Sequence, residues 1–172
     1  MVVHFWNDAT SSFYMTSDNH ESLIIRPKNN YDLSLPSGNS VSSFVMLRLF
    51  HLTQEQEFLK ISTKIMESQA QMAAENPFGF GYLLNTLYIY LQKPTEITII
   101  NDENSGICKY LNEKFIPESI LVTVNDKSKL DELSKFPFFK GKHFVEKTSV
   151  FVCKDFTCSL PLYSIDEIES NL

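Results

Sequence analysis

The most informative segment of the sequence begins at Arg26. Residues 26–40 read RPKNNYDLSLPSGNS, and residues 41–50 continue as VSSFVMLRLF. The first part is polar, charged and rich in turn-forming residues, whereas the second is apolar on most faces of a helix. This pattern predicts a helix over about residues 40–52 that is buried nearly all round. Two basic residues, one acid and a Ser-Gly-Asn-Ser turn lead to its N-terminus, so a site, if the protein has one, is expected there.

Two further helices are predicted after this one. Residues 54–75 carry apolar side chains at helical spacing on one face and polar side chains on the other. Asn76-Pro77 ends that helix, because proline disfavours helical backbone before it. Residues 78–92 form an aromatic-rich helix whose start is weakened by Gly79 and Gly81.

A β-hairpin is predicted ahead of the helices. Residues 12–16 and 22–26 are short β-prone runs, and the turn-rich residues 17–20 lie between them. Three helices, of which one is buried on all sides, cannot close a core by themselves. Either the second half of the chain covers them, or something outside this chain does.

The pattern changes at Lys93-Pro94. Residues 96–101 and 119–124 are β-branched runs, and the segment 105–115 between them has a helical pattern. A strand, a helix and a strand in succession form a βαβ unit, so the two strands should be parallel. A helix at 128–135, a loop at 136–141, a strand at 148–153 and a final helix that starts from the capping box Ser164–Glu167 complete the prediction. The fold class is α+β: a hairpin and helices in residues 1–93, and a small α/β part in residues 94–172.

Composition excludes several partners and locations. The net charge of −6 and the pI of about 5.2 argue against nucleic acid or an anionic membrane, since both require a basic face. The sequence contains no run of about 18 apolar residues that could span a bilayer. Its three cysteines, and an N-terminus without an apolar targeting core, are typical of a reducing cytoplasm and not of a disulfide scaffold. We therefore expect a cytoplasmic protein with no membrane or nucleic-acid partner.

The opening stretch has two interpretations. In the functional one, the helix N-terminus offers free N–H groups, Gly38 lets the backbone approach a ligand, and Arg26 binds a carboxylate, phosphate or sugar diol. Asp32 would then accept hydrogen bonds from hydroxyls or act as a general base. In the structural one, a residue such as Ser37 is simply an N-cap and Asp32 pairs with a nearby base. The candidate ligand-binding residues are Arg26, Lys28, Asp32, Ser37, Gly38 and Asn39.

Cys153 and Cys158 form a Cys-x4-Cys pair with three interpretations. A reversible disulfide after the strand at 148–153 would make them redox residues. A zinc site would need a second pair of ligands, and only Cys108 and His143 are near in sequence. Two small buried residues at a strand end need no chemistry at all, and this interpretation is preferred. No metal or cofactor is expected.

Several motifs in register resemble the YyaL-like family, the spermatogenesis-associated thioredoxin-fold proteins. They begin with Phe5-Trp6-Asn7-Asp8 and Phe13-Tyr14-Met15-Thr16, which resemble a hairpin of that family although Ser11-Ser12 replaces a Gly-Gly pair and Asn7 replaces an aspartate. Residues 25–28, Asp32 and residues 36–40 follow, and then Leu47-Arg48-Leu49 and Leu52-Thr53. Residues 152–161, VCKDFTCSLP, resemble its C-terminal Val-Cys-x-x-x-x-Cys-x-x-Pro motif. The resemblance covers essentially the whole chain.

The resemblance implies more than this sequence contains. Full-length members resemble a thioredoxin-like domain followed by an (α/α)6 toroid, similar to N-acylglucosamine 2-epimerases and six-hairpin glycosidases. This chain would supply the closing helices of the toroid, in residues 1–93, and a C-terminal α/β piece. The candidate residues would then face a central pocket, and the ligand would be a sugar or a sugar phosphate.

Three functions remain open at this point. The chain would contribute pocket residues and structural closure to a carbohydrate-binding or carbohydrate-processing toroid, with upstream toroid and thioredoxin-like domains as its partners. Alternatively, it is a non-catalytic interaction module that buries its aromatic helices against a partner or a second copy. The third possibility is a thiol redox module that uses Cys153 and Cys158. Catalysis by these 172 residues alone is not expected.

Overall fold

The structure, a computed structural model, describes residues 1–21, 24–103, 105–155 and 157–172. The chain forms two compact units. The helical unit comprises Met1–His51 with Glu55–Leu91, and the sheet unit comprises Leu52–Gln54 with Gln92–Leu172. The mixture of a hairpin, helices and a small sheet confirms the predicted α+β class. None of the helices in the described ranges is long and apolar enough to cross a membrane.

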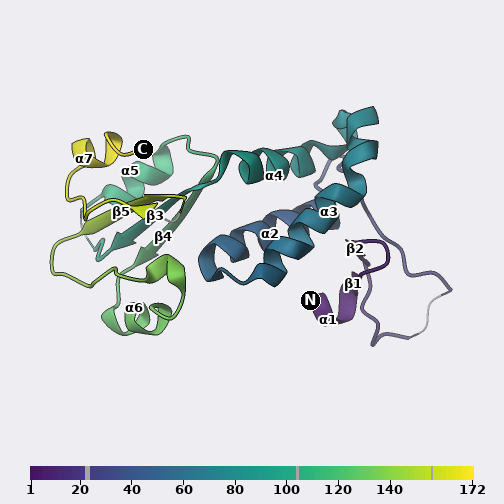
Figure 1. The fold of residues 1–172 in the computed structure, drawn as a ribbon, viewed down its shortest axis with the longest axis horizontal. Helices are drawn as coiled ribbons and strands as arrows, with labels where there is room; N and C mark the ends of the chain where they lie inside the picture. The colour runs from purple at the N-terminus through teal and green to yellow at the C-terminus, as the bar shows by residue number, and fades with distance from the viewer. Residues whose placement is uncertain (22–23, 104, 156) are drawn as a thin grey trace. The chain divides into compact units, whose positions relative to one another are not determined.

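Three long helices dominate the helical unit (Figure 1). They follow α1 (Val2–Phe5), β1 (Trp6–Asn7) and β2 (Ser12–Phe13), and they are α2 (Gly38–Thr53), α3 (Gln56–Glu75) and α4 (Gly81–Gln92). Ile65 and Phe80 are completely buried in the apolar core between these elements. Where α2 crosses α3, the hydroxyls of Ser43 and Ser62 each donate to the other residue's carbonyl oxygen, at 3.1 and 2.8 Å. The small serines bring the two helices close together, and each buried hydroxyl is hydrogen-bonded.

The third helix begins later than predicted. Pro77–Phe80 forms a short 3-10 turn, η1, and α4 starts at Gly81 instead of residue 78. Proline favours a first helical turn, and the glycines that follow are poor helix formers. Asn76 ends α3, as predicted.

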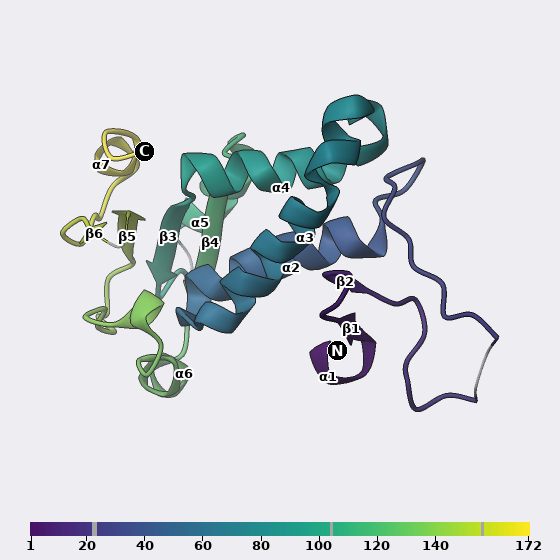
Figure 2. The same ribbon diagram turned by 45° about the vertical axis from the view of Figure 1, so that its right-hand side comes forward.

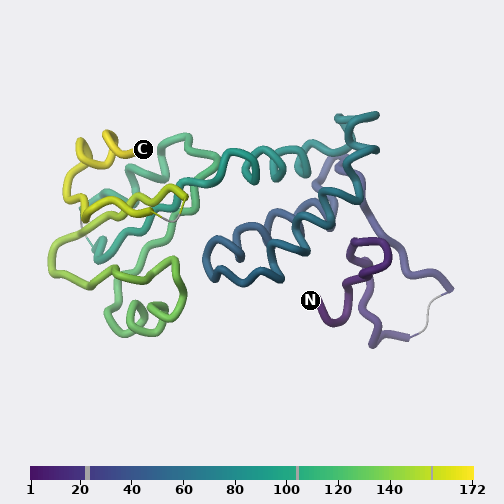
Figure 3. Tube along the Cα trace, viewed as in Figure 1, coloured from purple at the N-terminus to yellow at the C-terminus, as the bar shows by residue number. Residues whose placement is uncertain are grey.

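The predicted hairpin is wrong in its position. The observed antiparallel pair joins Trp6 to Phe13 and Asn7 to Ser12. Asn7 closes the turn, because its Oδ1 accepts hydrogen bonds from the backbone N and Oγ1 of Thr10 at 3.0 Å. Of the predicted strand 22–26, residues 22–23 lie outside the described residues and residues 24–26 form no strand. Ile24 and Ile25 have exposed fractions of 103% and 75%, so their side chains do not pack against a neighbouring surface. Such packing is what makes β-branched residues favour strands. Residues 24–37 trace an extended path without helix or strand (Figure 3).

The sheet unit carries a four-stranded sheet in the order β4-β3-β5-β6. The strands are β3 (Thr95–Ile100), β4 (Ser119–Val124), β5 (Ser149–Lys154) and β6 (Thr157–Cys158). The predicted parallel pairing of β3 with β4 is confirmed, and β5 runs antiparallel to β3. The two-residue strand β6 was not predicted.

Helices pack on both faces of this sheet (Figure 2). Ile97 and Ile99 of β3 face a cluster with α5 (Ile107–Glu113) and α7 (Ile165–Glu169). Ile100 faces a second cluster with α6 (Lys127–Leu133) and the 3-10 turn η2 (Pro137–Phe139). The strand is buried along its whole length, which suits a sequence that is β-branched except at Glu96. The capping box at Ser164 and Glu167 is present, as predicted.

Candidate functional site

Asp32 holds together two distant parts of the helical unit. Its carboxylate is 7% exposed. One oxygen accepts the N–H of Ser37 at 2.7 Å, and the other accepts the N–H groups of Tyr82 and Leu83 at 2.8 and 3.1 Å. Tyr82 and Leu83 lie in the first turn of α4, where a negative charge is stabilised by the helix dipole. The carboxylate therefore has its hydrogen-bonding capacity largely occupied by backbone N–H groups.

Ser37 and Asn39 also make internal hydrogen bonds. The fully buried hydroxyl of Ser37 accepts the N–H of Ser40 at 3.0 Å and so caps α2. Asn39 is 2% exposed, and its side chain bonds both the N–H and the carbonyl of Phe13, at 2.6 and 3.1 Å. The same amide nitrogen donates to the carbonyl of Asn29 at 2.9 Å. Asn39 thereby fastens β2 and the polar stretch to the start of α2.

The two basic residues gather around Tyr14 and not around Asp32. The guanidinium carbon of Arg26 lies 4.0 Å from the centre of the Tyr14 ring, and Nζ of Lys28 lies 4.4 Å from it. Arg26 donates to the carbonyls of His4 and Thr16 at 3.1 and 2.8 Å, and Lys28 donates to the hydroxyl of Thr10. The six candidate residues thus form two structural groups, one with Asp32, Ser37, Gly38 and Asn39 and one with Arg26 and Lys28.

A pocket of about 340 Å³ lies beside the start of α2. Aromatic rings from Phe5, Phe13 and Tyr14 line it together with Gly38 and Asn39. A Cβ atom built on Gly38 would meet nothing within 4 Å, so the glycine leaves open space there. This pocket leaves room for a ligand beside Gly38 and Asn39.

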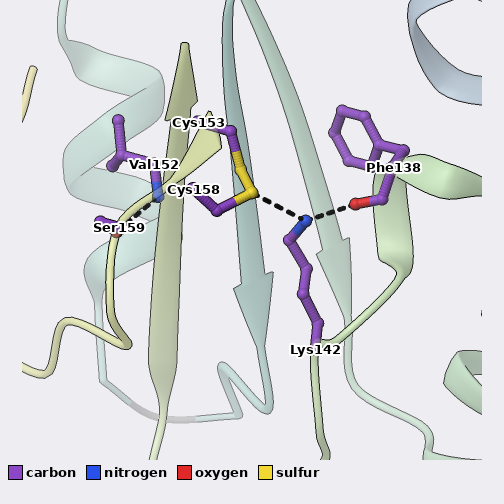
Figure 4. The surroundings of a disulfide bond; sticks show 6 residues. All are labelled: Phe138, Lys142, Val152, Cys153, Cys158 and Ser159. Atoms are coloured by element: carbon purple, nitrogen blue, oxygen red, sulfur yellow. Dashed lines mark hydrogen bonds between the residues drawn. A yellow bond between two sulfur atoms is a disulfide. The ribbon is translucent and has the colours of Figure 1, made fainter. Parts of the chain in front are cut away.

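Cys153 and Cys158 are joined by a disulfide bond in the sheet unit (Figure 4). They face each other across the antiparallel pair β5–β6. Cys153 is 1% exposed, whereas Cys158 is an exposed residue of the edge strand. The preferred sequence interpretation, two small buried residues, therefore describes Cys153 only, because the chain turns back to the sheet edge after β5.

Lys142 is a neighbour of this disulfide that the sequence did not reveal. Its Nζ lies 3.8 Å from Sγ of Cys158 and donates to the carbonyl of Phe138 (Figure 4). Lys142 is only 7% exposed. Burial lowers the pKa of its ammonium group, and the nearby charge of Glu96 opposes that shift. Sixteen positions separate Lys142 from Cys158, so only the fold brings them together.

Metal ligation has no geometric support in the part of the chain that the structure describes. Within those residues, no three His, Cys, Asp or Glu side chains come close enough together to hold an ion. The third cysteine, Cys108, lies in α5, and its Sγ is 3.5 Å from the hydroxyl of Thr123.

The chain is therefore an α+β protein, in which a helical unit with internally bonded polar residues is followed by a sheet unit with an edge disulfide. Comparison with known proteins finds no matching family model and no matching solved structure. The chain is similar to an uncharacterized protein of Caenorhabditis elegans, with 23% identity over 97% of this chain and 23% of that protein. It is also similar to spermatogenesis-associated protein 20 of mouse and of human, each 20% identical over 92% of this chain and 21% of the relative.

The similarity supports a relationship to the spermatogenesis-associated proteins along nearly the whole chain. The chain spans about a fifth of the length of these relatives. An activity of a whole relative can therefore be assigned to this chain only as a proposal.

Proposed function

We propose that the chain is a packing module of a larger helical protein and is not catalytic by itself. The observation that carries this proposal is an apolar groove of about 420 Å³ on the helical unit. The groove lies along α3 and α4, and its lining includes Met66, Ala70, Ala73, Leu84 and Leu87. The small alanine side chains among larger apolar ones form the floor of this groove, and ridges of side chains on a further helix can pack into such a groove.

The candidate residues support the same proposal. Asp32, Ser37 and Asn39 use their polar atoms to fix helix starts and the hairpin. The chain matches only about a fifth of the length of its relatives. In this proposal, a helix equivalent to one in the remaining part of those relatives occupies the groove. The closing position in an (α/α)6 toroid, implied by the family resemblance, is one architecture that would supply such a helix.

The substitution Ala70→Arg tests the groove. Without its occupant, the exposed groove should make the wild-type chain associate at high concentration, because water-exposed apolar surface favours contact between copies. A charged side chain in the groove should abolish that association. The free energy of unfolding should be nearly unchanged, since arginine is a good helix former. Light scattering over a concentration series measures both proteins.

Gln71→Arg is the matched control, because Gln71 is the next residue of α3, is exposed and is not among the groove residues. This variant should associate as the wild type does. A wild-type chain that stays strictly monomeric at its highest soluble concentration would count against the proposal.

The pocket beside α2 favours a second candidate function, a wall of a carbohydrate site. The aromatic residues that line the pocket have flat apolar rings, and Asn29 and Ser42 are polar residues of the same lining. Pockets that combine apolar walls with a few polar groups are typical of small-molecule sites. A sugar or sugar phosphate is the ligand that the family resemblance suggests.

The substitution Gly38→Leu tests this second candidate. A Cβ atom at Gly38 meets nothing within 4 Å, and Gly38 lines the pocket, so we expect the leucine to occupy the pocket while the fold is retained and binding is lost. A thermal-shift panel of monosaccharides and sugar phosphates should stabilise the wild type and leave the variant unaffected. Gly81→Leu is a matched control, since Gly81 also has no atom within 4 Å of its added Cβ and does not line this pocket. If no sugar in the panel shifts the wild-type midpoint, this candidate fails.

A further inference from the structure

We propose that Cys153 and Cys158 form a redox-active pair, in which Cys158 exchanges with an external thiol or disulfide and Lys142 stabilises its thiolate. This inference concerns the sheet unit and does not depend on the packing role of the helical unit. Three observations carry it: the unequal exposure of the two cysteines, a buried lysine beside Cys158, and a pocket that Cys158 lines.

Access distinguishes the two cysteines. Cys153 is 1% exposed in β5, a strand that pairs with β3 on one side and β6 on the other. Cys158 is exposed on the edge strand β6. In this proposal an external thiolate reaches Sγ of Cys158 through the pocket that Cys158 lines, and Cys153 serves as the internal partner that re-forms the bond. Attack on one defined sulfur is a requirement of selective thiol–disulfide exchange.

The charge beside Cys158 suits a thiolate. Nζ of Lys142 lies 3.8 Å from Sγ of Cys158, and the lysine residue is only 7% exposed. A nearby lysine lowers the pKa of a cysteine thiol because it stabilises the negative form. The charge of Glu96 in β3 acts on Lys142, and Glu96 is buried and pairs in register with Cys153. Lys142 thus faces a carboxylate in the oxidised state and gains a second anionic partner on reduction.

A pocket provides room for the exchange partner. It has a volume of about 400 Å³ and is lined by Cys158, Lys142, His143, Leu160 and Tyr163, among others. Its position at an exposed sheet edge allows either a small thiol or a cysteine on a peptide segment to enter. The shared chemistry is a sulfur nucleophile or a disulfide, and the experiment separates the two sources.

The reaction is balanced as follows. A thiolate of a dithiol reductant attacks Sγ of Cys158, the Cys153–Cys158 bond breaks, and Cys153 leaves as a thiolate that takes up a proton. The second thiol of the reductant then loses its proton and attacks the mixed disulfide, which releases Cys158 as a thiolate beside Lys142. The protein disulfide gains two electrons, and the reductant leaves as a disulfide. The reverse sequence reduces a partner disulfide.

Alkylation kinetics test the role of Lys142. In a Cys108→Ser background, the protein reduced with dithiothreitol should react with iodoacetamide first at Cys158. Lys142→Met should slow this reaction about tenfold at neutral pH, since one unit of thiol pKa changes the thiolate fraction tenfold. Lys142→Arg should restore most of the rate. Lys135→Met is the matched control, because Lys135 is exposed and does not line the pocket at Cys158. Mass spectrometry locates the label, and circular dichroism verifies the fold of each variant.

Trapping tests the exchange itself. Cys153→Ser in the same background should form a stable mixed disulfide at Cys158 with glutathione disulfide or with a disulfide-bonded peptide, whereas Cys158→Ser should form far less at the buried Cys153. Reaction with glutathione disulfide identifies a small-molecule partner, and reaction with the peptide alone identifies a protein partner. The proposal is overturned if neither reagent labels Cys158, if native air-exposed protein retains three free thiols, or if dithiothreitol cannot reduce the bond without unfolding the chain.

Discussion

Asp32→Asn should lower the free energy of unfolding of the helical unit by about 3 kcal/mol, because hydrogen bonds to charged groups and unpaired buried donors each contribute on this scale. The wild-type carboxylate accepts three backbone N–H groups. An asparagine keeps only one oxygen acceptor and turns an NH₂ donor towards an N–H group. Urea unfolding followed by the fluorescence of Trp6, the only tryptophan of the chain, measures the helical unit specifically.

Asp18→Asn is the matched control, since Asp18 is exposed and pairs only with exposed His4 in the interactions described. Such surface pairs contribute little to stability, so the control midpoint should hardly move. If Asp32→Asn unfolds at the wild-type urea concentration, the carboxylate is not a structural cap, and its candidacy as a ligand-binding group becomes stronger.

Asn39→Ala is expected to have the second large effect, also about 3 kcal/mol, because it leaves the N–H and the carbonyl of buried Phe13 without their partner. The loss should loosen β2 from α2 and shift the Trp6 signal, since the Trp6 ring contacts Phe13 with ring centres 4.9 Å apart. The same urea series, read by fluorescence, measures the effect.

Asn30→Ala is the comparison for this variant. Asn30 is only half-buried, and its side chain accepts one hydrogen bond from Asn39 at 3.0 Å. Its removal should cost about 1 kcal/mol, the scale of a single neutral hydrogen bond. Equal stability of the wild type and Asn39→Ala would contradict the structural role assigned to this amide.

The sequence predicted correctly those strands and helix starts that depend on residues close to one another in the chain. The β-branched runs that became β3 and β4 carry their strand preference in their own residues, and their parallel pairing follows from the short helical connection. The capping box of α7 also lies within a few residues. By contrast, Ile24 and Ile25 have the same β propensity but no surface to pack on, so the predicted hairpin failed there.

The candidate sites depended on contacts that a linear pattern does not contain. Asp32 accepts the N–H of Tyr82, which lies fifty positions away, and no local pattern contains this contact. Lys142 meets Cys158 only because η2 and β6 converge at one edge of the sheet. In both cases the sequence shows the residue itself. It does not show the group that the residue contacts, which is the N–H of Tyr82 for Asp32 and Sγ of Cys158 for Lys142.

The crossing of α2 and α3 has a consequence for how precisely these helices are aligned. Apolar side chains at a crossing can repack after a shift of one turn, because one methyl group replaces another at small cost. The hydroxyls of Ser43 and Ser62 each need the other residue's carbonyl oxygen, and that requirement is met in a single alignment. The longitudinal register of the two longest helices is therefore specified by directional bonds at one point, and the apolar side chains on either side only have to fill the space that this alignment leaves.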